Sequence, residues 1–241
     1  MLTVRLAATR SIPDALVVPV VATEGGPVIP AVPALPEDAR AEAVTLLADA
    51  PEPAGAGTIT LLPRPGGRPE LVLLAGVGAT DPAGGVPVAG WRAAGAAVRR
   101  AATSQPPRSP ARGLTIGVPA DAGPDAVRGL AEALWLAAYR FVAEPRPGAA
   151  PAQVLRRVTL AVDDPGRYAA ALEMARDGAE ATRWARDMTN TPGSRKSPDW
   201  FARQVAGAAA DRAGVTVTVR GPAELAAAGF GGVLAVAGGS V

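Results

Sequence analysis

Short apolar segments alternate with longer segments of helical periodicity over the first 165 residues. The most restrictive of them is Leu71–Ala75, LVLLA, which has no polar position. A strand that is apolar throughout is covered by protein on both faces. Strands that alternate with helices indicate an α/β domain. The sequence therefore predicts a mixed sheet flanked by helices over residues 1–165.

The other predicted strands of this domain are short β-branched or apolar runs, and the helices repeat apolar residues at helical spacing. The strands are expected at residues 4–6, 15–21, 58–62, 114–118 and 157–162. The helices are expected at residues 37–50, 87–102 and 123–141. Proline-rich loops are predicted at residues 27–36, 106–107 and 145–151, and the turn at residues 63–69 makes a hairpin-like pair of its flanking strands.

A long charged helix is predicted from Pro165 to Met188, with the i,i+4 pairs Arg176/Glu180 and Arg183/Asp187. Arg186 and Asp187 are expected to be helix-surface or inter-domain partners, without a catalytic role. Because this helix follows the α/β domain, we divide the chain into a domain at residues 1–165 and a linker helix at residues 166–190.

The remaining residues, 191–241, are predicted to be the truncated start of a second domain. Ser197-Pro-Asp199 is a good helix start, and this helix should run to about Ala213. The expected strand at residues 215–219, the short helix at residues 222–228 and the final strand at residues 233–236 would give an incomplete α/β unit.

The chain contains neither histidine nor cysteine. This composition excludes disulfides, thiol nucleophiles, Cys or His metal sites and triads with an imidazole base. The sequence pI is about 9.6 but the net charge is only +2, and the arginines are scattered. Nucleic acid is therefore not an expected partner.

The N-terminus lacks a basic segment followed by an apolar one, so no signal peptide is predicted. No apolar run approaches the roughly 20 residues that cross a bilayer, so no membrane partner is expected. Together with the absence of cysteine, which fits the cytosol, these features predict a cytoplasmic protein.

A glycine-rich turn, Gly76–Asp81, follows the apolar strand and could cradle a phosphate. The third glycine of the dinucleotide fingerprint is absent, and Asp81-Pro82 separates the turn from the next helix. A plain turn at the end of the strand is the favoured interpretation.

Polar side chains elsewhere do not combine into a catalytic site. Asp163 and Asp164 could bind a cation, but Pro165 and Gly166 favour a helix-capping turn. Lys196 lies in a polar loop without apolar surroundings that would lower its pKa. Ser194 and Ser197 have no histidine to activate them. We therefore predict no catalytic, metal-binding or cofactor-binding residue in this chain.

The stretch Arg183–Pro192, RWARDMTNTP, is the most distinctive in the chain. With Ser197-Pro-Asp-Trp200 and the segment 229–239, GFGGVLAVAGG, it resembles the leucyl aminopeptidase family, the cytosolic M17 metallopeptidases. Weaker similarity covers the upstream segments 14–20, DALVVPV, 129–141, GLAEALWLAAYRF, and 158–162, VTLAV, in the same order.

This resemblance implies a macro-domain-like N-terminal domain followed by the start of a peptidase domain. It also implies an intact enzyme that binds two divalent metal ions, Zn or Mn, releases N-terminal amino acids from peptides, and forms homo-hexamers. The family's metal-binding segments do not occur here: Asn190-Thr191 is followed by Pro192, and Lys196 lacks the glycine and aspartate that follow the family's lysine. The chain alone is therefore expected to bind no metal and to be inactive.

Two explanations fit this truncated pattern: a fragment of a longer aminopeptidase, or a naturally short protein that keeps the non-catalytic part. Alternative functions are a binding or regulatory module, for an ADP-ribose-type ligand or DNA, and an assembly domain without a ligand.

Overall fold

The computed structural model describes residues 2–8, 11–104, 113–142, 155–210 and 212–238. The predicted loops at residues 106–107 and 145–151 lie outside these ranges. The chain divides into two compact units, Met1–Met188 and Thr189–Val241.

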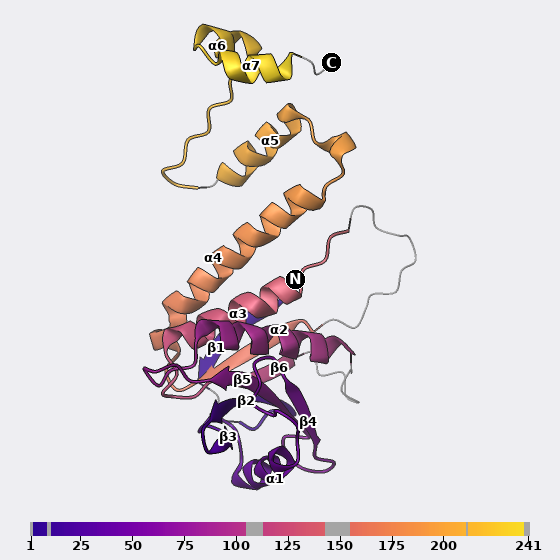
Figure 1. The fold of residues 1–241 in the computed structure, drawn as a ribbon, viewed down its shortest axis with the longest axis vertical. Helices are drawn as coiled ribbons and strands as arrows, with labels where there is room; N and C mark the ends of the chain where they lie inside the picture. The colour runs from indigo at the N-terminus through magenta and orange to yellow at the C-terminus, as the bar shows by residue number, and fades with distance from the viewer. Residues whose placement is uncertain (1, 9–10, 105–112, 143–154, 211, 239–241) are drawn as a thin grey trace. The chain divides into compact units, whose positions relative to one another are not determined.

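The first unit is built on a mixed sheet with the strand order β1-β7-β6-β2-β5-β4 (Figure 1). Its strands are β1 (Thr3–Ala8), β2 (Ala15–Thr23), β3 (Gly26–Val28), β4 (Ile59–Pro63), β5 (Leu71–Ala79), β6 (Gly113–Gly117) and β7 (Arg157–Val162). Neighbouring strands run parallel except that β4 is antiparallel to β5, and β3 forms a short antiparallel hairpin with β2. The predicted mixed α/β sheet is confirmed.

Helices cover both faces of this sheet (Figure 1). They are α1 (Glu37–Ala48), α2 (Val88–Ser104), α3 (Pro124–Ala137) and the first half of α4 (Pro165–Asn190). One core cluster contains Val17 and Leu73 with residues of α2, α3 and α4, and the other contains Leu16 and Leu74 with Ala43 and Leu47 of α1. Successive residues of β2 and β5 thus enter opposite cores, which explains why Leu71–Ala75 has no polar position.

Helices α2 and α3 pack closely because glycines lie where they cross. A Cβ atom on Gly95 would lie 2.8 Å from the Leu130 carbonyl oxygen, and one on Gly129 would lie 2.9 Å from the Trp91 Cβ. Both separations are below ordinary van der Waals contact. A chain with few aromatic residues thus gains dispersion contacts by bringing helix backbones close together.

The predicted helix 123–141 ends earlier than expected, at Ala137, and Phe141 lies outside it, 36% exposed. The other elements of this unit occur within a few residues of their predicted positions. Strand β5 continues to Ala79, and residues 26–28 of the predicted loop instead pair with β2.

The second unit differs from the prediction. It contains a 3₁₀ turn at Gly193–Arg195, α5 (Pro198–Ala209), α6 (Pro222–Ala227) and α7 (Gly231–Ala237). The expected strand at residues 215–219 is absent, and the expected strand at residues 233–236 is part of α7. Both expectations are wrong for the same reason: a strand needs a neighbour for its backbone groups, and the described residues of this unit offer none, whereas a helix satisfies its own.

The buried Arg64 joins the β4–β5 hairpin to α1. Its guanidinium donates to Asp38 Oδ2 at 2.6 Å and to Glu42 Oε2 at 2.9 Å, and also to the Pro69 carbonyl oxygen at 3.3 Å. The Arg64 side chain is 4% exposed, whereas those of Asp38 and Glu42 are 67% and 49% exposed. This cation thus supports the packing of α1 on the sheet.

We expect Arg64→Met to lower the free energy of unfolding by about 1–2 kcal/mol, measured by urea denaturation. The loss is smaller than for a fully buried ion pair because the two carboxylates left behind are accessible to water. Arg68→Met, at an exposed arginine of the same hairpin, is the matched control and should change stability by less than about 0.5 kcal/mol. Equal effects of the two substitutions would contradict this role.

The same contact predicts a dependence of stability on pH. The hydrogen bond from Arg64, together with the backbone N–H of Ala39, lowers the pKa of Asp38 from its usual 3.8. A carboxyl group whose pKa is lower in the folded state stabilises the fold above its unfolded pKa and loses that contribution as the pH falls through the folded value. Asp38→Asn should therefore cost stability at pH 6, and its difference from the unmodified chain should shrink as the pH falls from 3.8 through the lowered folded pKa, in urea titrations at each pH.

Candidate functional site

The end of α3 is joined to α4 by a cluster of polar contacts. The Tyr139 hydroxyl donates to Asp187 Oδ1 at 2.9 Å, and Arg186 Nη1 donates to the Leu136 carbonyl oxygen at 3.1 Å. The Arg186 guanidinium also lies 5.4 Å from the centroid of the Tyr139 ring. Because the last carbonyls of a helix have no partner within the helix, Arg186 caps the C-terminal end of α3. Arg186 and Asp187 are thus inter-helix partners within residues 1–188.

Trp135, near the end of α3, is joined to the residue before β1 by a hydrogen bond. Its indole Nε1 donates to the Leu2 carbonyl oxygen at 3.1 Å. An indole N–H in an apolar setting needs such an acceptor. This hydrogen bond sets the orientation of the ring.

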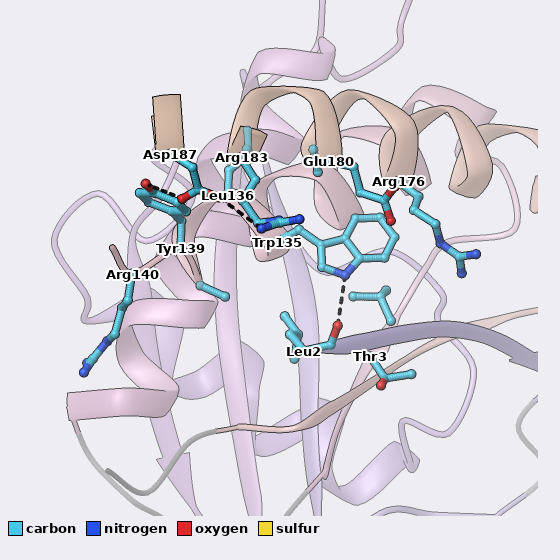
Figure 2. Close-up of a pocket in the computed structure, with 13 residues that line it drawn as sticks. Leu2, Thr3, Trp135, Leu136, Tyr139, Arg140, Arg176, Glu180, Arg183 and Asp187 are labelled. Atoms are coloured by element: carbon cyan, nitrogen blue, oxygen red, sulfur yellow. Dashed lines mark hydrogen bonds and ion pairs between the residues drawn. The ribbon is translucent and has the colours of Figure 1, made fainter. Parts of the chain in front are cut away.

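A cavity of about 410 Å³ lies between α3, α4 and the start of β1 (Figure 2). Its lining is mostly apolar on the α3 and β1 sides and charged on the α4 side. The lining residues are Leu2, Thr3, Val4, Trp135, Leu136, Ala138, Tyr139, Arg140, Arg176, Ala179, Glu180, Arg183 and Asp187. All of them belong to the first unit.

The charged wall of the cavity comes from one face of α4. Arg183 pairs with Asp187 at 3.1 Å, as predicted, but Arg176 pairs with Glu173 at 3.4 Å instead of with Glu180. The predicted Arg176/Glu180 pair is therefore wrong. Both i−3 and i+4 neighbours are within reach on a helix, and side-chain packing decides between them.

Two buried titratable groups lie outside the cavity lining, Tyr168 on α4 and Arg99 on α2. Burial raises the pKa of Tyr168, whose hydroxyl donates to the Ala122 carbonyl oxygen at 2.9 Å. Burial, and secondarily the positive charge of Arg140, lowers the pKa of Arg99. Tyr168 belongs to the core, so we assign it a structural role.

The glycine-rich segment 76–81 is not the turn that was favoured: residues 76–79 continue β5, and the turn follows at residues 81–85. Asp81 Oδ1 accepts hydrogen bonds from the backbone N–H groups of Ala83 and Gly85. Since these N–H groups bind the chain's own carboxylate, they do not form a phosphate cradle.

The paired carboxylates Asp163 and Asp164 make local turn contacts. Asp163 Oδ1 accepts from the Asp164 N–H at 2.8 Å, and Asp164 Oδ1 accepts from the Gly166 N–H at 2.9 Å. The predicted capping turn at the start of α4 is confirmed.

Ser194, Lys196 and Ser197, the candidate polar residues after Pro192, are exposed. Lys196 donates to the Thr189 carbonyl oxygen at 3.2 Å. Ser197 caps α5 as predicted, accepting from the Trp200 N–H at 3.1 Å. Ser194 lies in the 3₁₀ turn.

Metal-ligating side chains do not converge in the part of the chain that the structure describes: it holds no group of three or more Asp or Glu residues arranged for a metal ion. No helix within the described ranges is both long enough and apolar enough to cross a membrane. The cavity beside Trp135 is therefore the candidate site that we consider in the first unit.

Sequence reasoning missed this cavity. The signal available was that Trp135 and Tyr139, two of the chain's few aromatic residues, lie four residues apart near the end of the predicted helix 123–141. Their partners come from the first residues of the chain and from α4, and local periodicity does not reveal such distant contacts.

Comparison with known proteins gives one consistent family. Residues 183–241 match the model described as the catalytic domain of the cytosol aminopeptidase family. A probable cytosol aminopeptidase of Streptomyces coelicolor is 35% identical over 94% of this chain and 46% of its own length. The chain thus spans about half the length of this curated relative.

Two solved structures share the fold. The bottromycin maturation enzyme BotP in complex with Mn is 25% identical, with a TM-score of 0.62, over 92% of this chain and 42% of that one. A mutant of tomato leucine aminopeptidase is 17% identical, with a TM-score of 0.64, over 94% of this chain and 46% of that one. The predicted fold class, with its similarity to the N-terminal region of leucine aminopeptidase, is confirmed.

The contact between α3 and α4 can be tested by a double-mutant cycle. Tyr139→Phe removes the hydroxyl that binds Asp187, and should lower the free energy of unfolding by about 1 kcal/mol. When Asp187 is already Asn, the same substitution should cost less, because a charged acceptor makes the stronger hydrogen bond. Arg183→Met, which breaks only an exposed helical pair, is the control and should cost less than about 0.5 kcal/mol. A Tyr139→Phe variant as stable as the unmodified chain would exclude the contact as a support of α4.

Proposed function

We propose that this chain, which is related to the N-terminal part of the cytosol aminopeptidase family, is the non-catalytic part of a metal-dependent aminopeptidase. The intact enzyme would release N-terminal amino acids from peptides. The observation that carries the proposal is the 35% identity to a probable cytosol aminopeptidase over 94% of the chain. The family match to residues 183–241 supports it independently.

The proposal includes the division of the chain into a domain at residues 1–165, a linker helix at residues 166–190 and the start of a peptidase domain at residues 191–241. The family match begins at residue 183, in the last two turns of α4. Helix α4 continues without interruption from the core of the first unit to Asn190. A continuous helix is suited to joining a packed domain to the peptidase domain.

The surface of the second unit supports the proposal that residues 191–241 are unfinished. Within its described residues, no helical residue is buried, and large apolar side chains are exposed. Phe201 is 52% exposed, Val233 54% and Val236 85%. A domain that buried these side chains would need further residues against them.

The two divalent metal ions of the proposed reaction do not fit the described residues of this chain, since those residues hold no converging set of carboxylates. We therefore derive no catalytic step through them here. Metal binding, with Zn or Mn as the ion, is assigned to the rest of the intact enzyme, and a similar enzyme was solved in complex with Mn. We assign no catalytic, metal-binding or cofactor-binding residue to this chain.

We also propose the further properties that the resemblance to the leucyl aminopeptidase family implies. The first unit would be the macro-like N-terminal domain, peptides would be the substrates, and the assembly would be a homo-hexamer in the cytoplasm. Neither a nucleic acid nor a membrane is part of this proposal. The Asp81 turn, whose N–H groups bind their own carboxylate, argues against the alternative of a phosphate-binding module.

The purified 241-residue chain should not hydrolyse leucyl-p-nitroanilide in the presence of Mn²⁺, because its described residues supply no set of metal ligands. The absorbance of released p-nitroaniline gives the rate, and a full-length relative such as the Streptomyces coelicolor protein is the positive control. Turnover by the 241-residue chain above the rate of an enzyme-free blank would overturn the assignment of a non-catalytic part.

A further inference from the structure

The cavity between α3, α4 and β1 has the dimensions and the lining of a small-molecule site. Its volume of about 410 Å³ lies within the range of ligand pockets, roughly 300–1,000 Å³. Leu2, Val4, Trp135, Leu136 and Ala179 supply apolar surface. Such a cavity accommodates a compact apolar body, and the polar groups on its wall determine which head group that body can carry.

Of the two carboxylates that line the cavity, Asp187 is paired with Arg183, whereas Glu180 has no partner among the described residues. Arg140, which follows α3, is a further cation of the lining. The Glu180 side chain is partly buried and lines the cavity. Among the described residues it makes no hydrogen bond or ion pair, whereas Arg176 is paired with Glu173 and Arg183 with Asp187. The neighbouring cations of α4 therefore contact other carboxylates, and Glu180 is left available for a positively charged ligand.

Trp135 lines the same cavity from α3. Figure 2 shows the Glu180 carboxylate beside the indole of Trp135, while Arg176 is directed away from it. The hydrogen bond from Trp135 Nε1 to the Leu2 carbonyl oxygen holds the ring in place. A cation at the face of an indole ring is attracted by its quadrupole, and a nearby carboxylate adds a charge-assisted hydrogen bond.

We propose that this cavity binds a small organic ammonium ion, a primary amine with a compact apolar body. The ammonium group would contact the Glu180 carboxylate and Trp135, and the apolar body would fill the space beside Leu2, Val4 and Ala179. This site is separate from peptide hydrolysis, for which the described residues supply no metal ligands, so its test does not depend on the proposed function.

The test is a titration of the purified chain with three ligands that share one apolar body. 3-Methylbutylamine carries an ammonium group at pH 7, 3-methylbutan-1-ol is neutral, and 4-methylpentanoate is an anion. Isothermal calorimetry should give a dissociation constant of about 1 mM for the amine. The alcohol should bind about tenfold more weakly, and the carboxylate should not bind at up to about 20 mM. The tryptophan emission of the chain, to which Trp135 contributes, should change only with the amine and the alcohol.

Two matched variants assign the binding to Glu180. Glu180→Gln keeps the size of the side chain but removes its charge, and should weaken amine binding about tenfold while leaving binding of the alcohol unchanged. Asp177→Asn removes an exposed carboxylate of the same helix that lies outside the cavity lining and leaves the Arg176–Glu173 pair intact, and should change amine binding less than about twofold. Thermal unfolding of each variant checks that the fold is intact.

The proposal is overturned if the unmodified chain binds the amine no better than the alcohol, or binds neither at about 20 mM. It is also overturned if a folded Glu180→Gln variant binds the amine as tightly as the unmodified chain. The comparison of ligands on the unmodified chain decides the question even where a variant does not fold.

Discussion

The structure depends on covering both faces of the central strand pair β2–β5. Neither strand has a solvent-facing side, since Leu16 and Leu74 enter the core under α1 while Val17 and Leu73 enter the core under α2 and α3. Burial of this apolar surface is the main favourable term in folding. The buried Arg64 and the glycines between α2 and α3 then set how closely the covering helices approach.

Helix α4 has two different environments along its length. Tyr168, Leu172 and Ala175 pack in the core of the sheet, while the later turns contact the end of α3 through Arg186 and Asp187. Between these regions the helix face opens onto the cavity that contains Glu180. The distinctive stretch at residues 183–192 thus begins in the part of α4 that makes polar contacts with the end of α3. Glu180 lines the cavity without a core contact that would explain its position.

The second unit shows how strongly β-structure depends on neighbours. The alternating sequence at residues 215–219, VTVTV, and the apolar run at residues 233–236 both have the composition of strands. The first is unpaired and the second is helical. β-propensity describes how well a side chain fits a half-buried sheet, and no sheet exists among the described residues of this unit.

The sequence alone predicted most elements of the first unit, the capping roles of Ser197 and Asp164, and the resemblance to the leucyl aminopeptidase family, because these depend on local periodicity, turn chemistry and a distinctive motif at residues 183–192. The tertiary structure alone decided which ion pairs form on α4, where Arg186 and Asp187 bind, and that Trp135 and Glu180 line one cavity. These contacts join residues from the start of the chain, from α3 and from α4. Packing of distant segments determines them, and the spacing of residues along the sequence does not.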